Sequence, residues 1–334
     1  MKNKLLFLLL NTFCTVLFFN SCEKDEDTEL IGDWAKASDF EGIPRTDAVG
    51  FTIGDKAYLG TGYDGDERLN DFWEYDPERD FWQQKADLPG SGRNGAVGFG
   101  TESKGYIGTG YDGSEKLDDF WEYDPTSNAW LKKADFEGGA RYGSVGFAIE
   151  GIGYIGTGYD GNTLKDFWKY NPETDEWTQI VSIGGSKRRD ATAFVIDNKA
   201  YVFTGVNNGS YVSDFWCYDP SAETWTEKRE IENASDDDYD DEYDITGINA
   251  VGFSIGLMGY VATGGQGSVG NSVWEYDPLT DLWQKKTNFE GSARTEAVAF
   301  TVNNRGFIAT GRNSSYYFDD IWEFKPNDTY SKNY

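Results

Sequence analysis

Histidine is absent from the 334-residue sequence, and this absence restricts the chemistry that the protein can perform. Ser-His-Asp and Cys-His triads need imidazole, as do the common zinc, type-2 copper and non-haem iron sites. Any catalysis would have to use carboxylates, Tyr, Lys or Arg. Cysteine is scarce as well. Cys14 and Cys22 lie in the N-terminal segment that precedes the body of the chain, so Cys217 has no second cysteine in the body with which to form an internal disulfide. The fold must therefore be held together by its core.

Basic residues are few: 30 Lys and Arg stand against 58 Asp and Glu, so the formal net charge is −28. Nucleic-acid binding needs a basic face, and this balance argues against such a partner. The mean hydropathy of −0.62 excludes a protein with many membrane spans. No segment shows a helical apolar period over about ten residues. Aromatic residues at 16% and 40 glycines are abundant, which indicates many short strands joined by tight turns.

The N-terminus resembles the signal of a bacterial lipoprotein. Lys2 and Lys4 precede an apolar run from Leu5 to Phe19, which is shorter than the roughly 20 residues of a membrane span. The run ends just before Cys22, and the resemblance implies cleavage before this cysteine and its lipidation. An ordinary secretory signal is the alternative.

The residues that follow Cys22 are strongly charged. They resemble the acidic tracts behind the lipid cysteine in surface-exported lipoproteins of the Bacteroidota, and a plain solvated linker is the alternative. We therefore expect an outer-membrane lipoprotein, at the cell surface or facing the periplasm, that touches the membrane only through its lipid. The expected segments are a signal peptide over 1–21, an acidic tether over 22–33, a folded body over 34–326 and a tail over 327–334.

In the body of the chain, one repeat unit occurs six times. A Trp-x-Tyr-x-Pro element, with Phe replacing Tyr in the last copy, recurs at spacings of 48, 47, 48, 58 and 48 residues. Its tryptophans are Trp73, Trp121, Trp168, Trp216, Trp274 and Trp322. Each unit divides into four short strands, which in the first unit lie near 48–51, 57–60, 72–75 and from Trp82 onward. Four strands in a unit of this length are typical of a β-propeller blade.

The repeat resembles the Kelch family from Trp34 to Pro326, through its Tyr-x6-Trp pair and its apolar-then-Gly element. The family's Gly-Gly doublet is mostly Thr-Gly here, as at Thr61-Gly62. We expect an all-β fold: a six-bladed, monomeric β-propeller of four-stranded Kelch-type blades.

The sequence also predicts how the ring closes. The last unit lacks a fourth-strand Trp, while residues 34–42 copy residues 130–138. Residues 34–37 should therefore supply the outer strand of blade six and cover its open edge. The first strand of each unit should line the axis, because one position in it is always small. These residues are Gly50, Gly98, Gly146, Ala193, Gly252 and Ala299.

Five units carry an arginine six residues before the first-strand Phe, and unit five has Gly247 instead. The arginines are Arg45, Arg93, Arg141, Arg188 and Arg294. If the units superpose, these guanidiniums should converge around one mouth of the axis. The Kelch resemblance implies a ligand-binding role for them, and the arginine fork suits a carboxylate. The alternative is that each one pairs with an acid of a neighbouring blade, such as Asp47 or Asp190.

Three tyrosines should lie on the same face, in the loops between second and third strands. They are Tyr63, Tyr111 and Tyr159, and each precedes Asp-Gly. Tyrosine beside arginine and aspartate suits a sugar, through stacking and hydrogen bonds. The alternative is that the rings pack between blades and Asp-Gly only turns the chain.

An acidic insertion over residues 235–244 precedes unit five. Three interpretations compete. It is a solvated loop, a flap over the arginines, or a calcium loop with Asp236, Asp238 and Asp240 as ligands. No other cofactor is expected.

These observations predict non-enzymatic recognition of a glycan or an exported protein. Kelch propellers include galactose oxidases and sialic-acid epimerases. Because the copper of the oxidases needs histidine ligands, the missing histidine excludes that activity. A sugar mutarotase or epimerase remains the alternative, with arginine holding a sugar-acid carboxylate while Glu or Tyr moves protons. The repeat offers similar carboxylates in every unit, so no acid–base pair can be chosen. A structural partner in an envelope complex is a third possibility.

Overall fold

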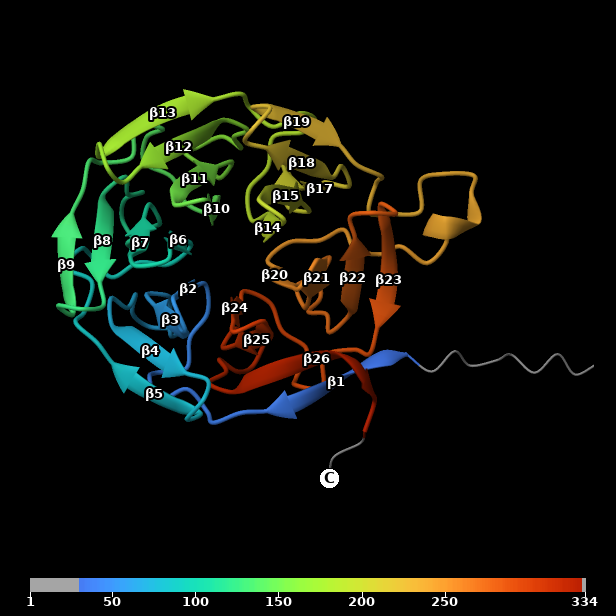
Figure 1. Ribbon diagram of the computed structural model, residues 1–334, viewed down its shortest axis with the longest axis horizontal. Helices are drawn as coiled ribbons and strands as arrows, with labels where there is room; N and C mark the ends of the chain where they lie inside the picture. Colours follow the sequence, from blue (N-terminus) through green and yellow to red (C-terminus); the bar gives the residue numbers. More distant parts are fainter. Residues whose placement is uncertain (1–29, 332–334) are drawn as a thin grey trace, which may run out of the picture.

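Six four-stranded antiparallel sheets stand around a common axis in the computed structural model, which describes residues 30–331 (Figure 1). This confirms the predicted all-β six-bladed propeller. The predicted signal peptide, Cys22 and most of the tether lie outside the described residues. Within them, no helix has the length and apolar character needed to cross a membrane.

The first three blades follow one pattern, in which strands run outward from the axis in chain order. Blade one contains β2 (Val49–Ile53), β3 (Lys56–Gly60), β4 (Phe72–Asp76) and β5 (Phe81–Gln84). Blade two contains β6 (Val97–Gly100), β7 (Gly105–Gly108), β8 (Phe120–Asp124) and β9 (Ala129–Lys132). Blade three contains β10 (Val145–Ile149), β11 (Ile152–Gly156), β12 (Phe167–Asn171) and β13 (Glu176–Ile180).

The other three blades add local variations to this pattern. Blade four contains β14 (Thr192–Ile196), β15 (Lys199–Phe203), β18 (Trp216–Asp219) and β19 (Thr224–Glu227), with a small hairpin of β16 (Val206–Asn207) and β17 (Ser210–Tyr211). Blade five contains β20 (Val251–Ile255), β21 (Met258–Ala262), β22 (Val273–Asp277) and β23 (Leu282–Lys286). Blade six contains β24 (Val298–Val302), β25 (Arg305–Ala309), β26 (Ile321–Thr329) and β1 (Ile31–Lys36).

The N-terminal strand closes the ring, as predicted. β1 pairs antiparallel with β26 and places Trp34 opposite Phe324 (Figure 1). The indole is buried and packs edge-on against Phe289, with ring centroids 4.9 Å apart. The strands are longer than predicted: β1 begins at Ile31 rather than at residue 34, and β26 continues to Thr329 beyond Pro326. Blade six thereby gains the fourth strand that its own unit does not encode.

The innermost strands line an axial channel whose cavity has a volume of about 180 Å³. The small residues of these strands are explained by the neighbouring blade. A Cβ atom at Gly50 would lie 2.1 Å from Val298 Cγ1, and one at Gly146 would lie 2.0 Å from Val97 Cγ1. The close approach of adjacent innermost strands, rather than the channel alone, therefore requires small side chains there.

Aromatic clusters between neighbouring blades form most of the core. Phe72 of blade one stacks on Tyr58 at 5.5 Å and meets Tyr123 and Trp130 of blade two edge-on, at 4.8 and 4.9 Å. Such pairs stabilise beyond the area that they bury. The aromatic surplus of the sequence is thus the interface between blades, repeated around the ring.

Candidate functional site

The five repeated arginines are buried inside the blades. Their exposure is 0–2%, and each forms an ion pair with the aspartate two residues before the third-strand Trp of its own unit. The pairs are Arg45–Asp71, Arg93–Asp119, Arg141–Asp166, Arg188–Asp214 and Arg294–Asp320. The expectation that these guanidiniums converge around one mouth of the axis to bind a ligand is therefore corrected. The proposed structural partners Asp47 and Asp190 are corrected too, since the actual partner lies within the same blade.

The contacts of Arg93 show that hydrogen bonds within the blade occupy its guanidinium. Its Nη1 and Nη2 donate to the two carboxylate oxygens of Asp119 at 2.5 and 2.8 Å, and Nη1 also donates to the Thr109 carbonyl at 3.0 Å. Burial on its own would raise the pKa of Asp119, but hydrogen bonding and charge from Arg93 hold it below the ordinary value. A ligand would have to break this bidentate pair to reach the guanidinium. The geometry favours a structural role for all five arginines.

A closed ring of backbone hydrogen bonds surrounds the mouth of the channel. It uses the residue two positions after each arginine, or after Gly247 in unit five: Asp47, Gly95, Gly143, Asp190, Asn249 and Glu296. Each N–H donates to the carbonyl of the corresponding residue in the preceding blade, at 2.8–3.3 Å. All six have φ between 55° and 64°, a left-handed conformation that glycine, aspartate and asparagine tolerate best. The ring joins all six blades and aims four polar side chains at the mouth.

These side chains line a cavity of about 130 Å³ at the mouth. Burial, reinforced by the charge of Glu296, raises the pKa of Asp47 to about 7, although Asn94 donates to its carboxylate at 2.9 Å. Burial also raises the pKa of Asp190 to about 6, against the opposing charge of Arg189. Glu296 is held by Arg312, whose Nε lies 2.6 Å from Oε2. The mouth thus combines Asp47 and Asp190, whose pKa values are raised, with two carboxylates that form ion pairs, Asp190 with Arg189 and Glu296 with Arg312.

Replacing Asp47 with asparagine is expected to stabilise the propeller at pH 8 by about 1–2 kcal/mol and to have little effect at pH 4.5. The folded protein holds the Asp47 proton up to a pKa of about 7, whereas the ordinary value is 3.8. The folded state therefore binds more protons, and the wild-type protein loses stability as the pH rises from about 4 to about 7. Asparagine removes this loss. Thermal unfolding at both pH values measures it, with the exposed Asp66→Asn as control. An equal difference at both pH values would contradict the assignment.

Tyrosine rings and two arginines follow one another around most of the mouth. Tyr317 lies beside Tyr63, Arg68 lies between Tyr63 and Tyr111, and Tyr111, Tyr142 and Tyr159 continue the series to Arg189. Neighbouring members are 4.9–6.4 Å apart. We call these seven residues the tyrosine arc. The three predicted tyrosines are thus brought together, on loops of blades one, two and three.

Arg68 is the member of the arc best suited to a ligand. Its guanidinium carbon lies 5.1 Å from the ring centre of Tyr63 and 4.9 Å from that of Tyr111. Its Nε donates to Asn94 Oδ1 at 2.7 Å, and Asn94 in turn donates to Asp47. Across the described part of the chain, no acidic side chain forms an ion pair with Arg68, which leaves its two Nη groups for a partner from outside.

Arg68, Tyr142, Arg189 and Tyr317 were not predicted from the sequence. A signal for them exists in the repeat. Isolated bridges pair the loops in the same way in successive blades, so Arg68, Lys116 and Tyr317 occupy equivalent positions. These positions differ from unit to unit, whereas the buried arginine is shared by five units. Residues common to the units hold each blade together, and residues that differ are free to form a site.

The acidic insertion projects outward from the rim between β19 and β23 (Figure 1), so of the three interpretations the flap over the arginines does not fit this placement. It contains the short 3-10 helix η1 (Asp238–Asp240). Asp240 turns inward, and its carboxylate accepts hydrogen bonds from the backbone N–H groups of Ala234 and Ser235, at 3.1 and 2.8 Å. Nowhere in residues 30–331 do three or more acidic or cysteine side chains gather as a metal site. The calcium interpretation for Asp236, Asp238 and Asp240 therefore gains no support.

Comparison with known proteins agrees with this architecture. The Kelch motif matches residues 153–183 and 187–230, which cover parts of blades three and four. The protein is a six-bladed β-propeller, and the Kelch motif matches it within these two segments. No curated protein matches the sequence. A solved structure titled "Structure of YjhT" is similar in fold, with a TM-score of 0.72 at 15% identity over 85% of this chain and 95% of that chain. At this identity the likeness concerns the fold alone.

Proposed function

We propose that the protein binds, without catalysis, a glycan that carries a carboxylate, at the mouth surrounded by the tyrosine arc. The observation that carries this proposal is Arg68, which is held between Tyr63 and Tyr111 with both Nη groups left for a ligand. A guanidinium fork recognises a carboxylate through two parallel hydrogen bonds. Tyrosine faces and hydroxyls around it suit the apolar faces and hydroxyls of sugar rings.

The rest of the mouth supports a bound sugar rather than a deep pocket. The channel beneath is narrow and is lined by alanine, glycine, valine and a few small hydroxyl residues. A sugar ring would stay at the mouth, where half-buried Asp47, Asp190 and Asn249 offer polar groups to hydroxyls. A protein partner that presents a carboxylate would use the same arginine, and failure of every glycan to bind would point to it.

The test is calorimetric titration with glucuronic acid and N-acetylneuraminic acid, beside glucose, which has no carboxylate. We expect the acids to bind at least about tenfold more tightly than glucose. Arg68→Met keeps the apolar stem between the tyrosines but removes the fork, and it should abolish this difference. Equal affinity for acids and glucose, or a preference that survives in Arg68→Met, would overturn the proposal.

A sugar mutarotase is the second candidate, and the mouth carboxyl groups favour it. Asp47 and Asp190, with pKa values raised to about 7 and about 6, line the same cavity and lie in the range of general acids and bases. Exchange between the anomers of N-acetylneuraminic acid, followed by NMR, distinguishes the two functions. Non-enzymatic binding predicts no acceleration over buffer. Acceleration that Asp47→Asn abolishes would establish the enzyme instead.

We also propose that the propeller is presented outside the cytoplasm on a lipid attached to Cys22. The signal-like N-terminus and the acidic tract behind it support this placement. Labelled palmitate should be incorporated by the wild-type protein and not by Cys22→Ser.

A further inference from the structure

Blade five has lost both members of the ion pair that the other blades share. Gly247 takes the place of the arginine, and Ser272 takes the place of the aspartate two residues before Trp274. The two losses occur together, so no buried charge is left without its counter-ion. The acidic insertion immediately precedes Gly247 in the chain. The position that a buried arginine–aspartate pair occupies in five blades therefore holds no such pair in blade five.

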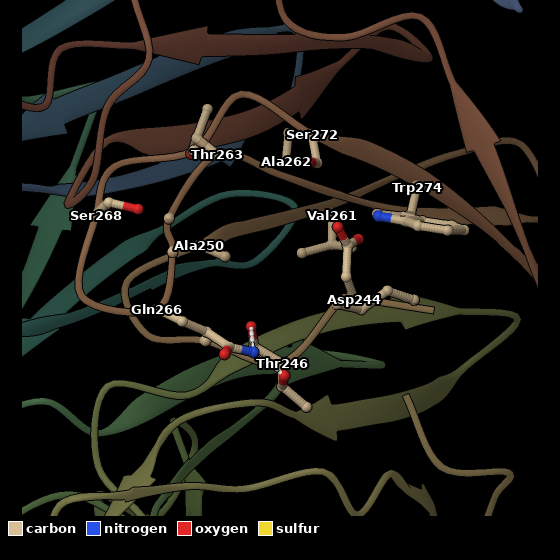
Figure 2. Close-up of a pocket in the computed structure, with 15 residues that line it drawn as sticks. Asp244, Thr246, Ala250, Val261, Ala262, Thr263, Gln266, Ser268, Ser272 and Trp274 are labelled. Carbon is tan, nitrogen blue, oxygen red and sulfur yellow. Dashed lines mark hydrogen bonds between the residues drawn. The ribbon is translucent and has the colours of Figure 1, made fainter. Parts of the chain in front are cut away.

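The vacated space is a cavity of about 280 Å³ (Figure 2). Thr263, Val261 and Trp274 form its buried part, while Gln266 and Ser268 are exposed at its outer end. Tyr243 of the insertion packs edge-on against Trp274 at 5.6 Å. The insertion thus forms part of the wall without filling the cavity, which stays open to solvent on one side.

Two groups that surround the arginine–aspartate pair in the other blades are still present in blade five: the threonine carbonyl and the tryptophan indole N–H. In blade two, the Thr109 carbonyl accepts from Arg93, and Asp119 Oδ2 accepts from both Arg93 Nη2 and the Trp121 indole, at 2.8 and 2.7 Å. In blade five, the carbonyl of Thr263 lies at the position equivalent to Thr109 and accepts no side-chain hydrogen bond from residues 30–331. The indole N–H of Trp274 is buried and has no hydrogen-bond partner.

A replacement carboxylate comes from the insertion. Asp244 lines the cavity, and Figure 2 shows its carboxylate and the Trp274 indole nitrogen turned toward the same space. It is the one ionisable side chain among the lining residues, and no Lys or Arg is among them. Asp236, Asp237 and Asp238 of the same loop lie nearby in the chain and are exposed. The cavity therefore favours a cation.

We propose that the cavity of blade five binds a guanidinium group, supplied by an arginine side chain of a partner polypeptide. The guanidinium would donate to the Thr263 carbonyl and to Asp244, as the internal arginines donate to threonine carbonyls and aspartates. The Asp244 carboxylate would also accept the indole N–H of Trp274, as Asp119 accepts that of Trp121. The outer opening at Gln266 and Ser268 lets a side chain enter from the surface. This site is separate from the tyrosine arc and does not depend on the glycan proposal.

The experiment is a titration of the protein with a blocked Gly-Arg-Gly tripeptide, followed by calorimetry and by the indole N–H resonance of Trp274, assigned with Trp274→Phe. The matched probes are the tripeptides with lysine or with citrulline, the neutral counterpart of arginine. We expect the arginine peptide to bind at least about tenfold more tightly than either. The indole resonance should shift on binding, because Asp244 closes on it. Equal affinity for the citrulline peptide would overturn the proposal.

Three variants make the test specific to this cavity. Asp244→Asn should weaken arginine binding by about tenfold or more. Ser272→Asp restores the aspartate of the other blades and should tighten binding by about tenfold. Gly247→Arg with Ser272→Asp fills the site internally and should abolish binding; a Cβ at Gly247 lies 3.0 Å from the Gly265 carbonyl oxygen, so a small shift there is needed. If Gly247→Arg prevents folding, Asp244→Asn and Ser272→Asp still test whether arginine binds in this cavity.

Unchanged affinity in both Asp244→Asn and Ser272→Asp would overturn the proposal. The source of the guanidinium is tested with agmatine, which has the group without a peptide backbone. Binding of agmatine without binding of the tripeptide would overturn the polypeptide partner.

Discussion

Replacing Arg93 with alanine is expected to lower the free energy of unfolding by about 3–5 kcal/mol. The guanidinium is fully buried, and its loss would leave Asp119 without its bidentate partner and the Thr109 carbonyl without a donor. Thr109 has φ of 59°, an unfavourable conformation for a β-branched residue, and the lost hydrogen bond helps to hold it. Urea unfolding, followed by tryptophan fluorescence, measures the change.

The double variant Arg93→Gly with Asp119→Ser is the matched control, because it reproduces what blade five contains naturally. Removing both charges leaves no uncompensated buried carboxylate, so the double variant should lose less stability than Arg93→Ala. A loss below about 1 kcal/mol for Arg93→Ala would mean that the pair is not structural. The alternative of a ligand-binding arginine would then regain support.

Replacing Trp34 with alanine is expected to cost about 3–5 kcal/mol. Trp34 is 1% exposed, and its ring packs against Phe289 and Phe324 at the only blade that is built from both ends of the described chain. The loss of this anchor both leaves a cavity and weakens the pairing of β1 with β26, which exposes the edge of blade six. Thermal and urea unfolding of the variant measure the effect.

Ile31→Ala is the control for Trp34→Ala, since Ile31 lies on the same strand but is 45% exposed. It should change stability by less than about 1 kcal/mol. If the two variants had equal effects, the closing strand would not be anchored through its buried tryptophan.

The fold could be predicted from the sequence because each blade repeats the same information. The Trp and Tyr positions set the strands, and the copy of residues 130–138 at residues 34–42 indicated the closing strand, which pairs with β26. The bounds of the closing strands were predicted less closely. Ile31 opposite Thr329 extends the pairing beyond the repeat, where no other copy exists for comparison.

The direction of a side chain within a repeat was harder to predict. The position of Arg93 shows that it lies near the loop face, but not whether it points to solvent or into the blade. That choice depends on Asp119, 26 residues away in the sequence, and on the left-handed backbone of Thr109. The hydrogen-bond ring through Asp47 and Glu296 was equally invisible, because it joins the two ends of the propeller.

The tyrosine arc was predicted only in part, because only some of its members belong to a repeated element. Tyr63, Tyr111 and Tyr159 share a recognisable Tyr-Asp-Gly element, so they could be placed on one face. Arg68 and Tyr142 occupy positions that change from blade to blade, and the search for common residues passed over them. In a repeat protein, the departures from the repeat carry as much functional information as the repeat itself.

The central claim is that Arg68, at a position that differs between blades, binds the ligand, while the arginine–aspartate pairs shared by five blades hold the blades together. The most direct measurement is a glycan array of sialylated, uronate-bearing, sulfated and neutral glycans, probed with the wild-type protein, Arg68→Met and Arg79→Met. Arg79 lies in the turn between β4 and β5, and 81% of its side chain is exposed. We expect carboxylate-bearing glycans to bind the wild-type protein and Arg79→Met equally and Arg68→Met not at all, with the melting temperature unchanged in both variants. Equal binding by all three proteins, or no binding of any acidic glycan, would contradict the account.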